Sequence, residues 1–357
     1  MKGKKLLNKT WKENAVTYGI VIIAYIIIQI MVQTGNISSL MKGLLVPVCV
    51  YVIMAVSLNL VVGISGELSL GHAGFMCAGA FSGALFTKCM ADTIGNPVVC
   101  FAIAVVVGAA TAAVFGILIG VPVLRLQGDY LAIVTLAFGE IIKNIVNALF
   151  IGRDENGLHF SLKSAMDLNL ADGGEVLIKG PQGITGNPRV ASFTIGVILI
   201  LITLFIVQNV INSRTGRAVM AIRDNRIAAQ SVGLSVTKYK LMAFTISAAL
   251  AGVGGVLYAH NLTTLTALPK NFGYNQSIMI LVFVVLGGIG NIRGSVIAAA
   301  ILTVLPELLR GMNDYRMLIY AIVLIVIMIF NSAPAIIGYR ERFMERFKNK
   351  SKTKEAL

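Results

Sequence analysis

The sequence predicts an all-α fold: a polytopic membrane bundle of about ten transmembrane helices with both termini in the cytoplasm. Hydrophobic residues make up 57% of the 357 residues and charged residues only 13%, whereas a soluble domain carries about 25% charged residues. The apolar residues also gather in runs long enough to cross a bilayer. Finally, clusters of basic residues flank these runs, as is typical of cytoplasmic segments in membrane proteins.

The apolar runs predict the membrane spans. The first run follows Lys2, Lys4 and Lys5 and has the look of a signal peptide, but it is long for one. No small-residue cleavage site follows it, so we interpret it as the first span. Two of the late runs are short and rich in glycine, which leaves the count open by one or two. The runs are 17–33, 42–63, 71–90, 97–122, 131–151, 191–211, 241–261, 276–290, 294–310 and 317–338.

The distribution of basic residues predicts the orientation of the chain, which we interpret as a single transmembrane domain, 1–357. Of the 30 Lys and Arg residues, five lie in 1–16, six in 212–240 and seven in 339–357. About ten spans place all three segments on one side, the cytoplasm. The net charge of +14 does not indicate nucleic-acid binding, because basic and aromatic residues are not interleaved.

The long polar loop at 152–190 then lies outside the membrane. Its glycines, together with Pro181 and Pro188, predict a structured loop without long helices. The loop either contacts an extracytoplasmic partner or closes the outer end of the bundle.

The polar segment 213–233 predicts a short amphipathic helix between two spans. Gly233 can adopt the left-handed conformation that ends such a helix. The segment is too polar to insert, so it lies on the lipid surface or docks into a groove of another protein. Five apolar residues fall on one face at helical spacing: Ala218, Ala221, Ile222, Ala229 and Val232.

The stretch from Gly216 to Gly252 closely resembles the inner-membrane permeases of branched-chain amino acid ABC importers, the LivM type. In that family the corresponding loop forms the coupling helix that sits on the ATPase subunit. A helix bracketed by two spans can transmit ATPase closure as a rigid-body push. The residues that match the motif, and that the resemblance implies for ATPase coupling, are Gly216, Arg217, Ala221, Ile222, Asp224, Asn225, Ala228, Ala229 and Gly233.

A second match, Leu58–Phe75, carries glycines that favour a break between two spans. Transporters place substrate contacts at such breaks. The family commonly has Gln where this chain has Glu67, which then has either a role in the path or a solvated position in a plain turn. His72 acts as a proton relay or as a hydrogen-bonded packing residue. No acidic partner at helical spacing lies in its own span, which favours packing.

Two further matches are Arg125–Asn147 and the glycine-rich turn Leu286–Ala299. In the first, Glu140, Lys143, Asn144 and Asn147 share one helix face. The Glu140–Lys143 combination either lines the path or neutralises itself and fixes helix packing. The candidate translocation path consists of Gly66, Ser69, Gly71, His72, Gly74, Phe75, Glu140 and Asn144.

The sequence has no phosphate-binding loop, no catalytic constellation and no metal-ligand spacing, with three His in all. The resemblance therefore implies a cell-membrane transport subunit that is no enzyme and holds no cofactor. ATP and Mg²⁺ would belong to two separate ATPase subunits. A second permease subunit and an extracytoplasmic binding protein complete the implied importer. Related permeases carry urea, short amides or other amino acids, and a stand-alone secondary carrier is the other alternative.

Overall fold

The computed structural model describes residues 2–35, 37–91, 93–126, 128–155, 157–171, 174–309 and 315–332. The chain divides into two compact units, Met1–Ala300 and Ile301–Leu357. The basic tail predicted at 339–357 lies outside the described residues. The predicted break within Leu58–Phe75 and the polar segment 213–233 both belong to the first unit.

Seven helices among the described residues are long and apolar enough to cross a membrane. The helix α2 continues directly into a π-helix, η1 (Leu60–Ser65), before the chain breaks. The seven are α1 (Lys2–Gln33), α2 (Ser39–Asn59), α3 (His72–Met90), α4 (Pro97–Val123), α5 (Asp129–Ala148), α6 (Phe193–Asn212) and α9 (Val236–Ala259). They confirm a helical, multi-span membrane protein.

Shorter helices occupy the remaining predicted spans. After the four-residue α10 (Pro269–Phe272) come α11 (Tyr274–Gly287), α12 (Ile292–Leu308) and α13 (Arg316–Ser332), of 14, 17 and 17 residues. These lengths lie at or below the lower end of the range for a membrane-spanning helix. The total of about ten spans therefore stays a prediction.

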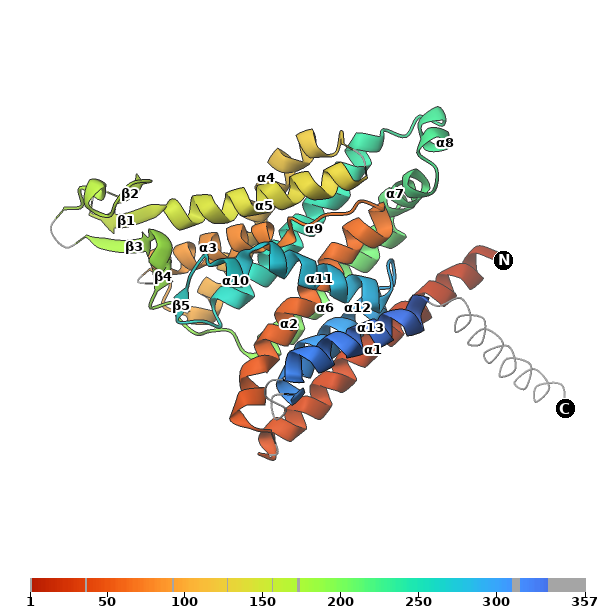
Figure 1. Cartoon of the computed structure of the whole chain (residues 1–357), viewed down its shortest axis with the longest axis horizontal. Helices are drawn as coiled ribbons and strands as arrows, with labels where there is room; N and C mark the ends of the chain where they lie inside the picture. Colours follow the sequence, from red (N-terminus) through yellow and green to blue (C-terminus); the bar gives the residue numbers. More distant parts are fainter. Residues whose placement is uncertain are drawn as a thin grey trace. The chain divides into compact units, whose positions relative to one another are not determined.

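The centre of the first unit is formed by α9, which packs against α2, α3 and α4 (Figure 1). Glycines allow the backbones to approach: a Cβ placed on Gly79 would lie 2.4 Å from the Cα of Gly252. A Cβ placed on Gly255 would lie 2.1 Å from the carbonyl oxygen of Met76. Small residues serve this close packing in lipid, where burial of apolar surface drives no association between helices.

Local sequence explains where α4 begins. The side chain of Asn96 accepts a hydrogen bond from the backbone N–H of Val98, at 3.0 Å. Pro97 occupies the first helical position, where its missing N–H costs no hydrogen bond. Asn followed by Pro is thus a strong start signal for this span.

Short strands form at one end of the first unit, and the polar helices α7 (Arg214–Asp224) and α8 (Arg226–Ser231) lie at the other end (Figure 1). An antiparallel sheet has the order β2-β1-β3, and a second, two-stranded sheet joins β4 to β5. The predicted loop without long helices is confirmed, although its strands were not predicted. The strands are β1 (Phe150–Asp154), β2 (Gly157–Ser161), β3 (Glu175–Lys179), β4 (Ile184–Thr185) and β5 (Thr264–Leu265).

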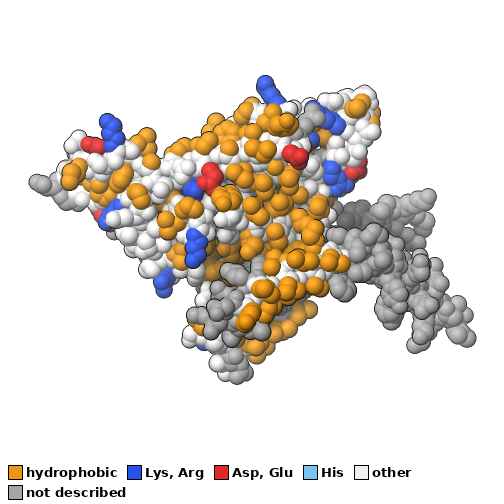
Figure 2. All heavy atoms as spheres, viewed as in Figure 1, with side chains coloured by type: hydrophobic (Ala, Val, Ile, Leu, Met, Phe, Trp, Pro, Cys, Tyr) orange, Lys and Arg blue, Asp and Glu red, His pale blue; other side chains and the backbone are white. Residues whose placement is uncertain are grey.

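Large apolar side chains remain exposed along the spans. Examples are Val106 and Leu118 in α4, Ile133 in α5 and Phe205 in α6, each more than half exposed. Figure 2 shows hydrophobic side chains spread over the face that α4 and α5 present. Such surfaces suit contact with lipid or with another membrane protein.

Candidate translocation and coupling site

The predicted break between the second and third spans is present. After η1, Gly66 adopts a left-handed conformation with φ of 73°, and no regular structure follows until α3 begins at His72. We call residues 59–71 the break. Its helical part is fully buried, which fits the rule that unwound backbone within a membrane is covered by protein.

Glu67 is not solvated, so the interpretation of a plain, water-exposed turn is wrong. Its carboxylate forms an ion pair with the ammonium group of Lys240 at the start of α9. The two side chains are 11% and 13% exposed. The pair therefore joins the break to a helix 173 residues further along the chain.

Asn59, the first residue of the break, hydrogen-bonds to the glycine-rich turn between α11 and α12 and to the start of α12. Its Nδ2 donates to Ser295 Oγ at 2.8 Å, and its Oδ1 accepts from the backbone N–H of Gly290 at 2.8 Å. A Cβ placed on Gly63 would lie 2.3 Å from that same nitrogen. The predicted turn is confirmed, and it packs directly on η1.

The start of α3 is held by side chains of two other helices. The backbone N–H of Leu70 donates to Thr135 Oγ1 in α5, and that of Ala73 donates to Ser277 Oγ in α11, both at 3.0 Å. The predicted path glycines Gly71 and Gly74 lie against the backbone of α5. Close packing against α5 therefore explains why these two positions are glycines.

His72 and Phe75 of the candidate path are buried in packing contacts. His72 Nε2 lies 2.7 Å from Ser57 Oγ, which agrees with the predicted hydrogen-bonded histidine. Phe75 packs edge-to-face against Phe244, with ring centroids 5.5 Å apart.

Two hydroxyl groups in the break have unused hydrogen-bonding capacity. Ser65 Oγ and Ser69 Oγ are buried and have no hydrogen-bond partner among the described residues. Buried polar atoms are nearly always paired in folded proteins. Ser69, a predicted path residue, and Ser65, which was not predicted, are thus the side chains of the break that are free to bind a polar group.

In α5, Glu140 and Lys143 form the ion pair that the packing interpretation predicted. Glu140 Oε1 also accepts the backbone N–H of Tyr274, the first residue of α11, at 2.7 Å. A carboxylate at a helix N-terminus is stabilised by the unpaired N–H groups and the helix dipole. Asn144 is exposed and Asn147 is half-buried. The four polar residues of α5 therefore differ in burial, and only Glu140 and Lys143 form a pair.

The segment 213–233 is two helices, and the prediction of one continuous helix is wrong. The chain breaks at Asn225, with φ of −153°, where its side-chain Oδ1 accepts the N–H of Ala228 and caps α8. Gly233 has φ of 87° and ends α8, as predicted. The bonds Gly233 N–H to Gln230 and Leu234 N–H to Ala229 complete this C-terminal motif.

The interruption at Asn225 divides the predicted apolar face. Ile222 and Ala229 are buried together with Val236 of α9, while Ala221 and Val232 are exposed. Ile227, which the sequence analysis did not select, is 80% exposed. Of the remaining predicted coupling residues, Gly216 is buried and Arg217, Asp224, Asn225, Ala228 and Gly233 are exposed.

Arg223 links α7 to the break. Its Nη1 donates to the carbonyl oxygen of Gly63 at 2.8 Å, while Nε and Nη2 donate to Asp224 Oδ1 at 3.0 and 2.9 Å. Sequence reasoning did not select Arg223 or Lys240, although both lie inside the matched stretch. Their basic character was read only as a sign of the cytoplasmic side.

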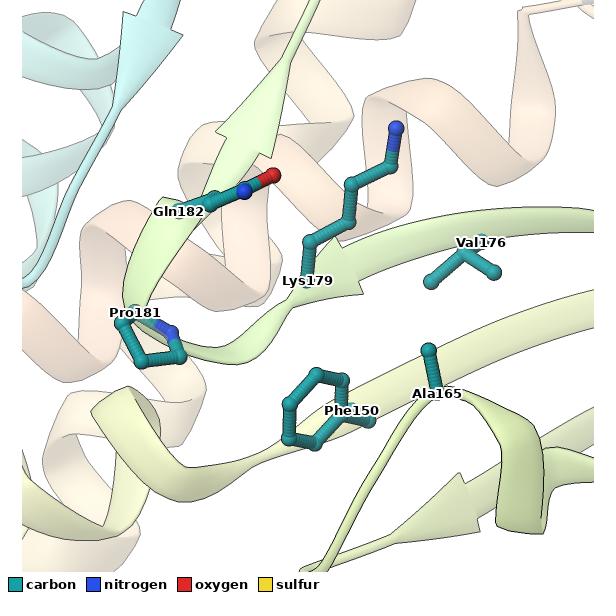
Figure 3. A pocket seen from close by; sticks show the side chains of 6 residues that line it. All are labelled: Phe150, Ala165, Val176, Lys179, Pro181 and Gln182. Atoms are coloured by element: carbon teal, nitrogen blue, oxygen red, sulfur yellow. The ribbon is translucent and has the colours of Figure 1, made fainter.

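At the strand end, a cavity of about 400 Å³ opens between the sheet and the chain that leads into β4. Figure 3 shows its lining: Phe150 of β1, Val176 and Lys179 of β3, Ala165, Pro181 and Gln182. The backbone N–H of Asn187 donates to Thr263 and its side chain to Ala259, which ties the loop to the end of α9. This agrees with a cap, while the 90% exposed Met166 leaves surface for a partner.

Comparison with known families shows the family to which the chain belongs. Residues 40–328 match the family described as the permease component of branched-chain amino acid transport systems. The chain belongs to this family. The match covers the break, the coupling segment and the glycine-rich turn.

Individual relatives agree with this assignment. The chain is 36% identical over 290 residues to the high-affinity branched-chain amino acid transport system permease protein LivM of Salmonella typhimurium, and equally to that of Escherichia coli. The alignment covers 79% of this chain and 66% of each relative, just under two thirds of their length. The fructose import permease protein FruG of Bifidobacterium longum is 24% identical over 165 residues, 43% of this chain and 48% of FruG. No solved structure matches the chain significantly.

Proposed function

We propose that this permease is the transmembrane subunit of an ATP-driven ABC importer for branched-chain amino acids (leucine, isoleucine and valine). The observation that carries the proposal is the polar pair of helices α7 and α8, fixed between two spans and hydrogen-bonded to the break. A stand-alone carrier has no use for such a segment. The family membership supports the same function.

The proposal includes a topology of about ten spans in a bacterial cell membrane, with both termini, α7 and α8 in the cytoplasm. The chain then forms one permease domain, with the sheet end outside. Seven helices among the described residues meet the requirements for a span, and α11, α12 and α13 complete the count. The basic segments 1–16, 212–240 and 339–357 support this orientation.

The partners in the proposal are a second permease subunit, two ATPase subunits that bind ATP and Mg²⁺, and an extracytoplasmic binding protein. The chain itself contributes neither catalysis nor a cofactor. Two exposed apolar side chains, Ile227 of α8 and Val232 directly after this helix, provide the contact for an ATPase subunit. Met166 and the surface around it provide the outer contact.

The substrate path runs past the break, between Ser69 and the neighbouring helices α5 and α11. The free hydroxyls of Ser65 and Ser69 can bind the charged end of an amino acid. Glu140 takes a structural part, because its oxygens already bind Lys143 and the start of α11. Urea, short amides and other amino acids are the alternative substrates, and a solute gradient is the alternative energy source.

The decisive experiment reconstitutes the complete importer in proteoliposomes and measures leucine uptake with and without ATP inside the vesicles. We expect uptake only with ATP, the ATPases and the binding protein together. Uptake by this chain alone, without ATP, would contradict the proposal. Competition by isoleucine, valine, urea and acetamide then separates the substrate alternatives.

A substitution tests the docking surface directly. Ala221→Asp places a charge on the exposed side of α7 and should separate ATP hydrolysis from uptake while the protein still inserts. Thr93→Asp introduces the same charge at an exposed site of the opposite end, in the turn after α3, and should leave ATP hydrolysis and uptake unaffected. Equal uptake and ATPase activity in Ala221→Asp and wild type would argue against docking here.

A further inference from the structure

We propose that Arg223 and Lys240 are positioning residues that carry the movement of the coupling segment into the break. The inference rests on the proposed function and deepens it. Both cations bind the break, and neither was identified from the sequence as a coupling residue. Arg223 attaches the break to α7, and Lys240 attaches it to α9, the helix that follows the coupling segment 213–233.

The Arg223 attachment follows from the way η1 ends. The last carbonyl groups of a helix have no intrahelical partner, and the turn at Gly66 leaves the Gly63 carbonyl without one. Arg223 donates a charge-assisted hydrogen bond to this carbonyl oxygen. Asp224 binds two other nitrogens of the same guanidinium group and fixes its direction.

The fit between Arg223 and the break is close. A Cβ placed on Gly66 would lie 2.6 Å from Arg223 Cγ, so the side chain passes directly over the glycine. Any displacement of α7 toward the membrane therefore presses on the turn as well as on the hydrogen bond. A contact that is packed and bonded at the same place transmits movement in both directions.

The Lys240 attachment is more deeply buried. Lys240 and Glu67 each keep little more than a tenth of their side chain exposed, and removal of either would leave the other charge uncompensated. The pair therefore resists separation. It ties the residue that follows Gly66 to the first turns of α9.

The two cations move as one body. Ile222 of α7, Ala229 of α8 and Val236 of α9 form one buried cluster, with Leu234 and Tyr239 packed against it. This cluster connects the helix that holds Arg223 to the helix that holds Lys240. A push on α8 thus reaches the break through both attachments, next to the free hydroxyls of Ser65 and Ser69.

The test uses the complete reconstituted importer and measures leucine uptake per ATP hydrolysed. Arg223→Ala and Lys240→Met should each lower this ratio about fivefold or more, the range of typical coupling free energies. Arg223→Lys, which keeps one donor for the Gly63 carbonyl, should retain part of it. The matched control is Lys238→Met, an exposed lysine on the same helix as Lys240, which should keep the wild-type ratio.

A reversible bridge separates coupling from misfolding. In Glu67→Cys/Lys240→Cys, a bifunctional methanethiosulfonate linker replaces the ion pair by a covalent link. We expect a low ratio without the linker, recovery with it, and loss again after reduction. Wild-type ratios in Arg223→Ala and Lys240→Met, or no recovery on bridging, would overturn the inference. A wild-type complex that shows no ATP-driven uptake would instead refute the proposed function.

Discussion

Two ion pairs of the first unit, Glu140–Lys143 and Glu67–Lys240, are alike in chemistry and differ in what they connect. The first joins residues three apart in α5. The second joins the break to α9, 173 residues away. In both pairs the lysine side chain is at most 13% exposed, so charge neutralisation is necessary in each.

This difference separates a local role from a mechanical one. No helix movement can pull Glu140 away from Lys143, because both belong to one rigid element. The contact that Glu140 makes with the start of α11 fixes packing. Glu67 and Lys240, by contrast, change their separation whenever the break and α9 move relative to each other. Only the second pair can report or transmit such movement.

The largest expected effect belongs to the local pair. Glu140→Gln leaves the ammonium group of Lys143 buried without a counter-charge and should lower the stability by about 3 kcal/mol. Thermal unfolding of the purified permease in detergent measures this loss. In Glu140→Gln/Lys143→Met most of the stability should return. If the double variant is as unstable as the single one, the loss comes from the α11 contact instead.

Asn59 tests the attachment of the break to the glycine-rich turn. Asn59→Ala removes both side-chain bonds and leaves the Gly290 N–H and Ser295 Oγ without this partner, at a cost of about 1–3 kcal/mol. The unfolding temperature should fall accordingly. Asn209→Ala, which alters an exposed asparagine of α6, is the control and should change it little. An equal fall in the unfolding temperature of both variants would mean that the two bonds of Asn59 add no stability of their own.

Gly66 tests the shape of the break. Gly66→Ala requires a side chain in the left-handed region, at about 1–2 kcal/mol, and displaces Arg223. The variant should unfold at a lower temperature than wild type. Gly43→Ala meets no atoms within 4 Å in α2 and should stabilise slightly, because alanine favours helix. A stabilised Gly66→Ala would contradict the left-handed turn.

The smallest effect is expected from a polar contact at the sheet end. Burial lowers the pKa of the His260 imidazole below its ordinary value of 6.5, and its Nε2 lies 2.9 Å from Thr87 Oγ1. Below pH 6.5 the unfolded chain binds a proton that the folded protein does not bind. This part of the stability is therefore complete above pH 6.5 and decreases as the pH falls toward the folded-state pKa.

Unfolding temperatures of wild type and His260→Gln between pH 5 and 7.5 measure this contribution. The wild-type curve should fall more steeply on the acidic side than that of the variant. Parallel curves would mean that His260 is not held neutral. We expect the His260–Thr87 contact to contribute less to the unfolding temperature than the Glu67–Lys240 ion pair at the other end of α9.

Hydropathy and glycine patterns predicted the long spans, the break and the late turn, because membrane length and backbone packing leave periodic traces in the sequence. The Glu140–Lys143 pair was predictable from its spacing of three residues. The end of α8 at Gly233 was predictable because left-handed backbone favours glycine. Local signals thus identified local structure correctly.

The contacts between distant segments were not predictable from one sequence. Glu67 and Lys240, or Arg223 and Gly63, are brought together only by the packing of α7 and α9 against η1. The division of segment 213–233 was missed although Asn225 is a strong helix-capping residue. The apolar pattern of the segment continued across Asn225 and concealed the interruption of the helix there. The short strands near 150–185 lacked a clear alternation of apolar and polar residues.

The π-helix at Leu60–Ser65 also has a consequence for chain length. Its wider turn holds an additional residue, as in the single-turn insertions found in other helices. Deleting one residue there would convert the wide turn into an ordinary helical turn, because a π-helix absorbs an extra residue without changing the direction of the chain beyond it. The ion pair of Glu67 with Lys240 should then survive, whereas the Gly63 carbonyl, which lies inside the altered turn, would move away from Arg223. A relative with a one-residue gap at this place should therefore keep the second attachment and lose the first.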